Sequence, residues 1–69
     1  MLEVGILKTW DAVNYKAGVQ LAGSLTAYFD NLSVARNIAS AEMITGRHVV
    51  VAIPQGNPKD AVVIAVFTV

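Results

Sequence analysis

Cysteine is absent from this chain of 69 residues, and proline, aromatic and charged residues are scarce. Without cysteine the chain has no disulfide framework, no thiolate metal site and no cysteine nucleophile. Charged residues make up 14% of the sequence, and five basic residues balance five acidic ones. A general nucleic-acid-binding protein needs a surplus of Lys and Arg to displace counterions from phosphates. The charge balance therefore argues against nucleic acid as a partner.

Long apolar segments are missing as well. The longest unbroken apolar run extends from Ala61 to Phe67, well short of the roughly 18 residues that a membrane-spanning helix needs. The N-terminus lacks the basic region and apolar core of a signal peptide. We therefore expect no membrane association, and a protein that is cytoplasmic or is a virion component assembled in the cytoplasm.

Hydrophobic residues, in contrast, make up 55% of the chain, which is too high a share for a disordered protein with little net charge. The length predicts one small β-barrel domain over residues 1–69. A domain of about 60 residues is marginally stable alone, and small domains without disulfides or metals often gain stability by association. The apolar excess therefore indicates an oligomer.

Alternation of apolar and polar residues predicts strands, most clearly where Tyr15, Ala17, Val19 and Leu21 share one face. The remaining strands are expected over residues 1–10, 25–34 (with a bulge or turn at Asp30-Asn31), 47–53 and 61–69. Turns are expected at residues 11–14 and 23–24, a loop at 54–60, and a helical turn at 39–44 that Ser40 caps and a left-handed Gly46 follows. This order predicts an all-β fold, a small five-stranded Greek-key barrel of OB-like or SH3-like type with one short helical turn near residues 39–44.

The last two predicted strands are apolar on both faces. A small barrel fills only one face of each strand with its core, so the outward face needs a cover, for which a second subunit is a better candidate than the helical turn. If Val62, Ile64 and Val66 fill the barrel, Val63 and Phe67 face outward. The expected partner is the chain itself, in a trimer or larger ring. The expected oligomer interface comprises Val49, Val51, Val63 and Phe67.

Residues that carry chemistry lack partners in the sequence. His48 is the only histidine, whereas a metal site needs three or four converging ligands. Four carboxylates, those of Asp11, Asp30, Glu42 and Asp60, fall in predicted turns or at the helix start without a paired acid or base. The serines lack a nucleophile elbow, and the glycines do not match a phosphate-binding loop. We therefore predict that the protein is not an enzyme, with no catalytic residue, no cofactor and no metal.

Three segments together resemble one protein family. They are a first strand with Val4-Gly5-Ile6-Leu7 followed by residues 15–21, a helical piece and strand over residues 41–51, and the stretch Gly56-Asn57-Pro58 leading into residues 61–67. Their order is similar to the small barrel domain of phage tail and baseplate proteins of the baseplate assembly protein V type, and to related short phage structural proteins. Arg47 departs from the acidic residue usual in that family, and no spike needle follows the barrel. The resemblance implies a structural barrel that packs with other particle proteins.

These observations predict a non-enzymatic structural subunit that self-associates, in a phage or prophage tail or baseplate or as a capsid-accessory barrel. The alternative is a nucleic-acid-binding OB-like barrel, in which exposed aromatics stack on bases beside a basic groove. Tyr28, which falls on the polar face of its strand, would then make the contact together with Lys16 and Arg36. A small ligand-binding or regulatory oligomer is a more distant alternative.

Overall fold

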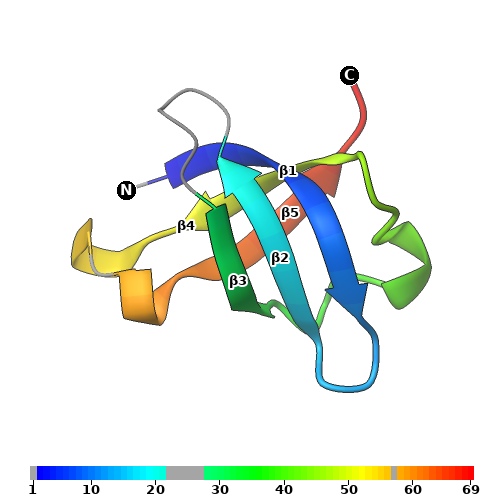
Figure 1. Ribbon diagram of the computed structural model, residues 1–69, viewed down its shortest axis with the longest axis horizontal. Helices are drawn as coiled ribbons and strands as arrows, with labels where there is room; N and C mark the ends of the chain where they lie inside the picture. Colours follow the sequence, from blue (N-terminus) through cyan, green and yellow to red (C-terminus); the bar gives the residue numbers. More distant parts are fainter. Residues whose placement is uncertain (1, 22–27, 57) are drawn as a thin grey trace.

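Five strands and three single 3-10 turns make up the computed structural model, which describes residues 2–21, 28–56 and 58–69 (Figure 1). In chain order they are β1 (Leu2–Asp11), β2 (Lys16–Leu21), β3 (Tyr28–Val34), η1 (Ser40–Glu42), β4 (His48–Ala52), η2 (Pro54–Gly56), η3 (Pro58–Asp60) and β5 (Val62–Phe67). The turn predicted at residues 23–24 and the predicted start of the third strand lie outside the described residues.

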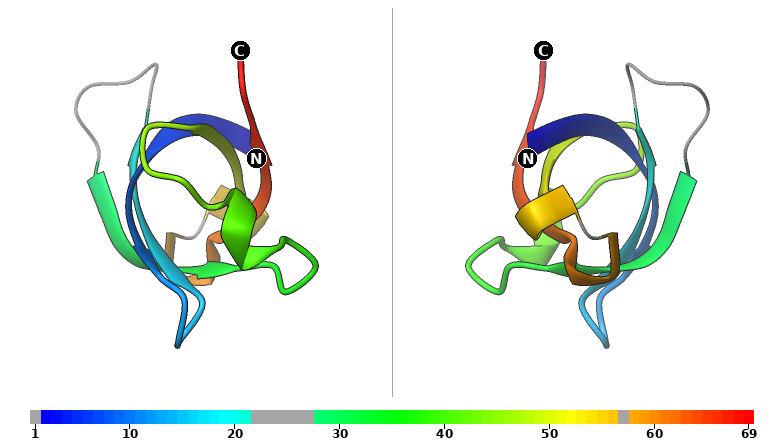
Figure 2. Two further views of the ribbon diagram at one scale, coloured as in Figure 1. Left: turned by 90° about the vertical axis from the view of Figure 1, so that its right-hand side faces the viewer. Right: turned by 90° about the vertical axis from the view of Figure 1, so that its left-hand side faces the viewer.

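The strands close into a barrel in the ring order β1-β2-β3-β5-β4 (Figures 1 and 2). All neighbours are antiparallel except β3 and β5, which run parallel and pair at Ser33–Val62 and Val34–Val63. The first three strands form a meander and β4 returns beside β1, which is the Greek-key arrangement. The predicted small five-stranded barrel is thereby confirmed.

The inward face of β2 follows the predicted alternation, because Ala17, Val19 and Leu21 are all buried. Val19 pairs with Leu7 of β1 on one side and with Phe29 of β3 on the other. Burying a side chain of this kind contributes about 1.5–3 kcal/mol. The largest fully buried side chains occupy such inward positions, namely Leu7, Val19, Val49, Val51 and Val63.

Irregularities in three strands change which residues face the core. The pairing of β1 with β2 shifts between Leu7 and Thr9. In β3 the shift falls at the predicted Asp30-Asn31 interruption, where Asn31 has a left-handed φ of 60°. In β5 the shift places an extra residue, Ile64, between the partners of Val50 and Val51. Each extra residue reverses the alternation beyond it.

The segment between β3 and β4 holds the predicted helical turn in its shortest form, the 3-10 turn η1. Its N-cap is Ala39 and no side chain caps it, so the prediction that Ser40 caps the turn is wrong. The Ser40 hydroxyl instead accepts a hydrogen bond from the Trp10 indole N–H at 3.1 Å, because a half-buried indole needs an acceptor. Gly46 has the predicted left-handed conformation, with φ of 96°.

Candidate interaction surface

Three of the four residues predicted to form an oligomer interface lie inside the barrel. Val49, Val51 and Val63 have no exposed surface, and Val51 on β4 pairs directly with Val63 on the neighbouring strand β5. The prediction is wrong for these residues because both faces of the two strands are apolar, so the sequence does not mark the inner one. The extra residue Ile64 then separates Val63 from Phe67, which lies outside with 40% of its surface exposed.

The strand pairings place apolar residues in three rows on the outside of β1, β4 and β5. Directly paired residues of neighbouring antiparallel strands project from the same face. The rows are Leu2–Ala52–Val62, Val4–Val50–Ala65 and Ile6–His48–Phe67, and Ile64 joins them at the bulge. We refer to these residues as the apolar outer face.

Much of the apolar outer face remains in contact with solvent. Its most exposed members are Leu2 at 65%, Val4 at 43%, Ile64 at 41% and Phe67 at 40%. No member is Asp, Glu, Lys or Arg. The His48 ring packs on the Phe67 ring with centroids 5.4 Å apart. Contiguous exposed apolar residues are typical of protein–protein contacts, so this face is a candidate contact surface.

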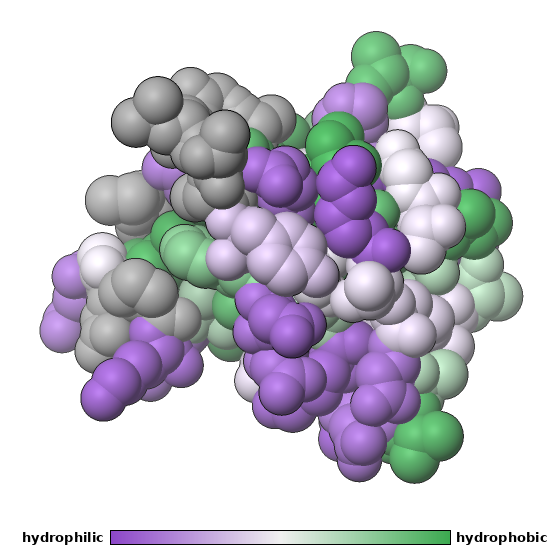
Figure 3. All heavy atoms as spheres, in the orientation of Figure 1, coloured by the Kyte–Doolittle hydropathy of each residue, from purple (hydrophilic) through white to green (hydrophobic). Residues whose placement is uncertain are grey.

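The outside of β2 and β3 has the opposite character. Lys16 pairs with Ser33, and its ammonium group donates a hydrogen bond to the Ser33 hydroxyl at 3.1 Å. Gln20 pairs with Tyr28 on the same face. Figure 3 shows hydrophilic residues gathered over this side of the molecule. The barrel therefore has one polar side, and the apolar outer face is not a general property of its surface.

The residues predicted for nucleic-acid contact lie apart, with Lys16 on β2, Tyr28 on β3 and Arg36 after the end of β3. Tyr28 is 45% exposed, and its ring lies over Gly18, where an added Cβ would collide with the phenol oxygen. Lys16 lies four residues before Gln20 on β2, and Gln20 is the partner of Tyr28. Lys16 and Tyr28 are therefore about 13 Å apart along the strand direction. The Arg36 guanidinium lies 5.0 Å from the centre of the Tyr15 ring.

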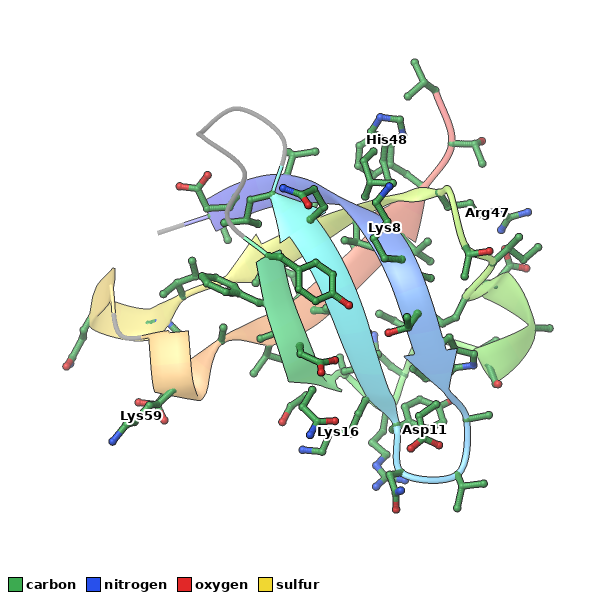
Figure 4. All side chains as sticks on the ribbon, viewed as in Figure 1. Lys8, Asp11, Lys16, Arg47, His48 and Lys59 are labelled. Atoms are coloured by element: carbon green, nitrogen blue, oxygen red, sulfur yellow. The ribbon has the colours of Figure 1, made fainter. Side chains whose placement is uncertain are left out.

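The lysines are likewise dispersed. Figure 4 shows Lys8, Lys16 and Lys59 in separate parts of the molecule, on β1, at the start of β2 and in η3. A groove that binds single-stranded nucleic acid needs basic groups in a line beside aromatic rings. The structure therefore does not bring the predicted nucleic-acid contacts together into one basic groove.

The β1–β2 turn contains a carboxylate whose pKa is lowered, that of Asp11. The Asn14 side-chain amide donates to Asp11 at 3.0 Å, and the backbone N–H groups of Asn14 and Val13 donate at 3.3 and 3.0 Å. These bonds, the Asn14 amide first, hold the pKa of Asp11 below its ordinary value of 3.8. Asp11 thus stabilises the predicted turn at residues 11–14 as an Asx-type residue.

The described part of the chain offers neither a metal site nor a pocket. It contains no group of three His, Asp or Glu side chains placed to hold a metal ion, and no pocket opens among its residues. No described helix is long and apolar enough to cross a bilayer. The apolar outer face is the strongest candidate for a functional surface in residues 2–21, 28–56 and 58–69.

Sequence reasoning missed most members of this face, although a signal for part of it was present. Leu2, Val4 and Ile6 alternate with Glu3 and Gly5, and such a pattern ordinarily marks the apolar set as the core.

No family model, no curated protein and no solved structure matches this chain.

Proposed function

We propose that this protein is a non-enzymatic structural subunit that self-associates through the apolar outer face. The observation that carries the proposal is a solvent-exposed face without Asp, Glu, Lys or Arg, on a barrel whose core is already filled from the opposite side of the same strands. Apolar surface removed from water contributes about 25 cal/mol per Å². Association of copies buries this face without disturbing the fold.

The setting that we propose is a phage or prophage particle, in a tail or baseplate or as a capsid-accessory barrel with other particle proteins as neighbours. Support for this setting comes from the sequence motifs over residues 41–51 and 56–67, which resemble those of baseplate barrels. A barrel that covers its outside with further subunits is suited to a ring or tube. The nucleic-acid alternative has weaker support, because Tyr28, Lys16 and Arg36 lie apart.

Two matched substitutions test self-association. Val4→Glu places a charge in the middle row of the apolar outer face, where Val4 is 43% exposed. Val13→Glu makes the same change in the β1–β2 turn, where Val13 is 87% exposed. An unpaired charge buried in a contact costs several kcal/mol. We expect the natural chain and Val13→Glu to form the same oligomer, and Val4→Glu to form a smaller species.

The measurement is size-exclusion chromatography with light scattering, together with circular dichroism to verify that both variants keep the β-barrel spectrum. A natural chain that stays monomeric contradicts the proposal. A folded Val4→Glu variant with the mass of the natural oligomer contradicts the assignment of the apolar outer face. Filter binding of single-stranded DNA at two salt concentrations tests the alternative, and we expect no tight, salt-sensitive binding.

A further inference from the structure

The strand β5 has a hydrogen-bonded neighbour along only part of one edge. On the β4 side it pairs from Val62 to Phe67, whereas on the β3 side its pairs are confined to Val62 and Val63. Figures 1 and 2 show β5 running away from β3 toward the C-terminus. Within the described residues, the second half of β5 therefore has a strand partner on one edge and none on the other.

Backbone polar groups point from this open edge. The Val63 carbonyl accepts a hydrogen bond from the Ala35 N–H at 2.9 Å, so it points away from β4. Val51 and Val49, the β4 partners of Val63 and Val66, lie two positions apart, and alternate residues of an antiparallel ladder direct their polar groups the same way. The N–H and C=O of Val66 thus point to the open edge, and those of Thr68 follow if the chain stays extended.

We infer that a second copy of the chain adds its own β5 to this edge, antiparallel, about a two-fold axis at Phe67. This inference rests on the proposed self-association and specifies its geometry. In this register Val66 of each copy lies opposite Thr68 of the other. The two residues of such a pair exchange N–H···O=C bonds in both directions, so the two pairs supply four hydrogen bonds.

The register about Phe67 is preferred to one about Val66. A two-fold axis at Val66 gives one reciprocal pair and places Thr68 opposite Ile64, where the bulge has turned the backbone toward β4. The axis at Phe67 also brings the two Phe67 rings together on the outside of the barrel. An aromatic pair across neighbouring strands is among the contacts that stabilise a sheet.

A second copy is the occupant that fits this edge chemically. The strand and its continuation read Val62-Val63-Ile64-Ala65-Val66-Phe67-Thr68-Val69, with no charged side chain to bind a phosphate or an acidic or basic segment. Exposed edges of this composition template the addition of another strand. An identical strand presents the same uncharged side chains and the same unpaired groups, so the two-fold contact is self-complementary.

The area required by a stable contact is larger than one edge strand supplies. A standard interface takes about 800 Å² and about 20–30 residues from each partner, which is about a fifth of the 4214 Å² surface of this chain. The apolar outer face alone has fewer residues. Strand addition places the apolar outer faces of two copies side by side on one continuous sheet, where they stay exposed until further copies cover them. Because the contact is two-fold, the complete assembly contains an even number of chains.

A disulfide test examines the register directly. The chain has no native cysteine, and residues in a non-hydrogen-bonded antiparallel pair have Cα atoms about 4.5 Å apart, within disulfide range. We expect Phe67→Cys to form a disulfide-linked dimer in nearly full yield under mild oxidation. Val13→Cys, an exposed position in the β1–β2 turn, serves as the control and is expected to stay largely unlinked. Equal yields in the two variants overturn the register.

Amide hydrogen exchange in the natural chain tests the edge without a substitution. We expect the Val66 and Thr68 amides to exchange at least about 100-fold more slowly in the oligomer than in a monomer obtained by dilution, since their protection comes from the partner. The Phe67 amide, which points to β4, is the internal reference for protection in both states. An oligomer with unprotected Val66 and Thr68 overturns strand addition and leaves the proposed function standing. A chain that is monomeric at every concentration overturns both.

Discussion

Two leucines of β1 allow the inner and outer faces of the barrel to be compared with one chemical change. Leu7 has no exposed surface, whereas Leu2 on the same strand is 65% exposed. The backbone bonds of Leu7 with Arg47 and Gly46, at 2.9 and 2.8 Å, do not involve its side chain. Leu7→Ala therefore removes core packing alone, and Leu2→Ala removes part of the apolar outer face alone.

The expected loss for Leu7→Ala is about 3 kcal/mol of unfolding free energy, within the range of about 2–5 kcal/mol for buried leucines. A domain of this length has a total stability of about 3–10 kcal/mol, so the variant loses a third or more of it. Leu2→Ala is expected to change the stability of the monomer by less than about 0.5 kcal/mol, while weakening association.

Denaturant titration followed by Trp10 fluorescence measures both losses, because the half-buried indole donates to Ser40 and loses this environment on unfolding. The titration is repeated at several protein concentrations, since the stability of an oligomer depends on concentration. Equal losses for Leu7→Ala and Leu2→Ala in dilute solution, or a loss below about 1 kcal/mol for Leu7→Ala, would refute the assignment of the inner and outer faces.

Two further predictions concern single positions. Gly5→Ala places a Cβ 2.5 Å from Val19 Cγ1 and 2.9 Å from the Gln20 carbonyl oxygen. We therefore expect the same titration to show a loss of about 1–3 kcal/mol of unfolding free energy from overpacking. An unchanged unfolding free energy would contradict this prediction. Asp11 has a lowered pKa, so its stabilising contribution is present above the ordinary value of 3.8 and is lost as the pH falls through the lowered value. Carboxyl NMR should show this lowered midpoint, and Asn14→Ala should raise it; a midpoint that does not move in Asn14→Ala would exclude the side-chain bond as the main cause.

The strands were predictable where one face is apolar and the other polar. In β2 the alternation of Ala17, Val19 and Leu21 with polar residues identifies both the strand and its inner face. The interruption at Asp30-Asn31 was predictable because both residues tolerate turn conformations, and Asn31 indeed has a left-handed φ. Local preference and burial agree at these positions, so the sequence suffices.

The inner faces of β1 and β5 were not predictable from local patterns. In β1 one core-facing position is filled by Gly5, where an added Cβ would meet Val19, while the more apolar set at Leu2, Val4 and Ile6 faces outward. In β5 the apolar character of both faces conceals the bulge at Ile64. A pattern based on hydrophobicity fails here because the outward face is itself apolar, which is the property that the proposed assembly explains.

The predicted nucleic-acid contacts illustrate a different limit. Tyr28 was expected to be exposed from its polar neighbours, and the structure places it on the outside at 45% exposure. The distance between Lys16, Arg36 and Tyr28 depends on the pairing of β2 with β3 and on the turn after β3. Sequence spacing does not specify either, so the dispersal of the three residues emerges only from the fold.

The most direct test of self-association is the molar mass of the natural chain in solution at micromolar concentration, measured by light scattering on the size-exclusion peak. Our account predicts a monodisperse species whose mass is an even multiple of 7.3 kDa. A monodisperse species of 7.3 kDa would contradict it, because the apolar outer face would then be stable in contact with water.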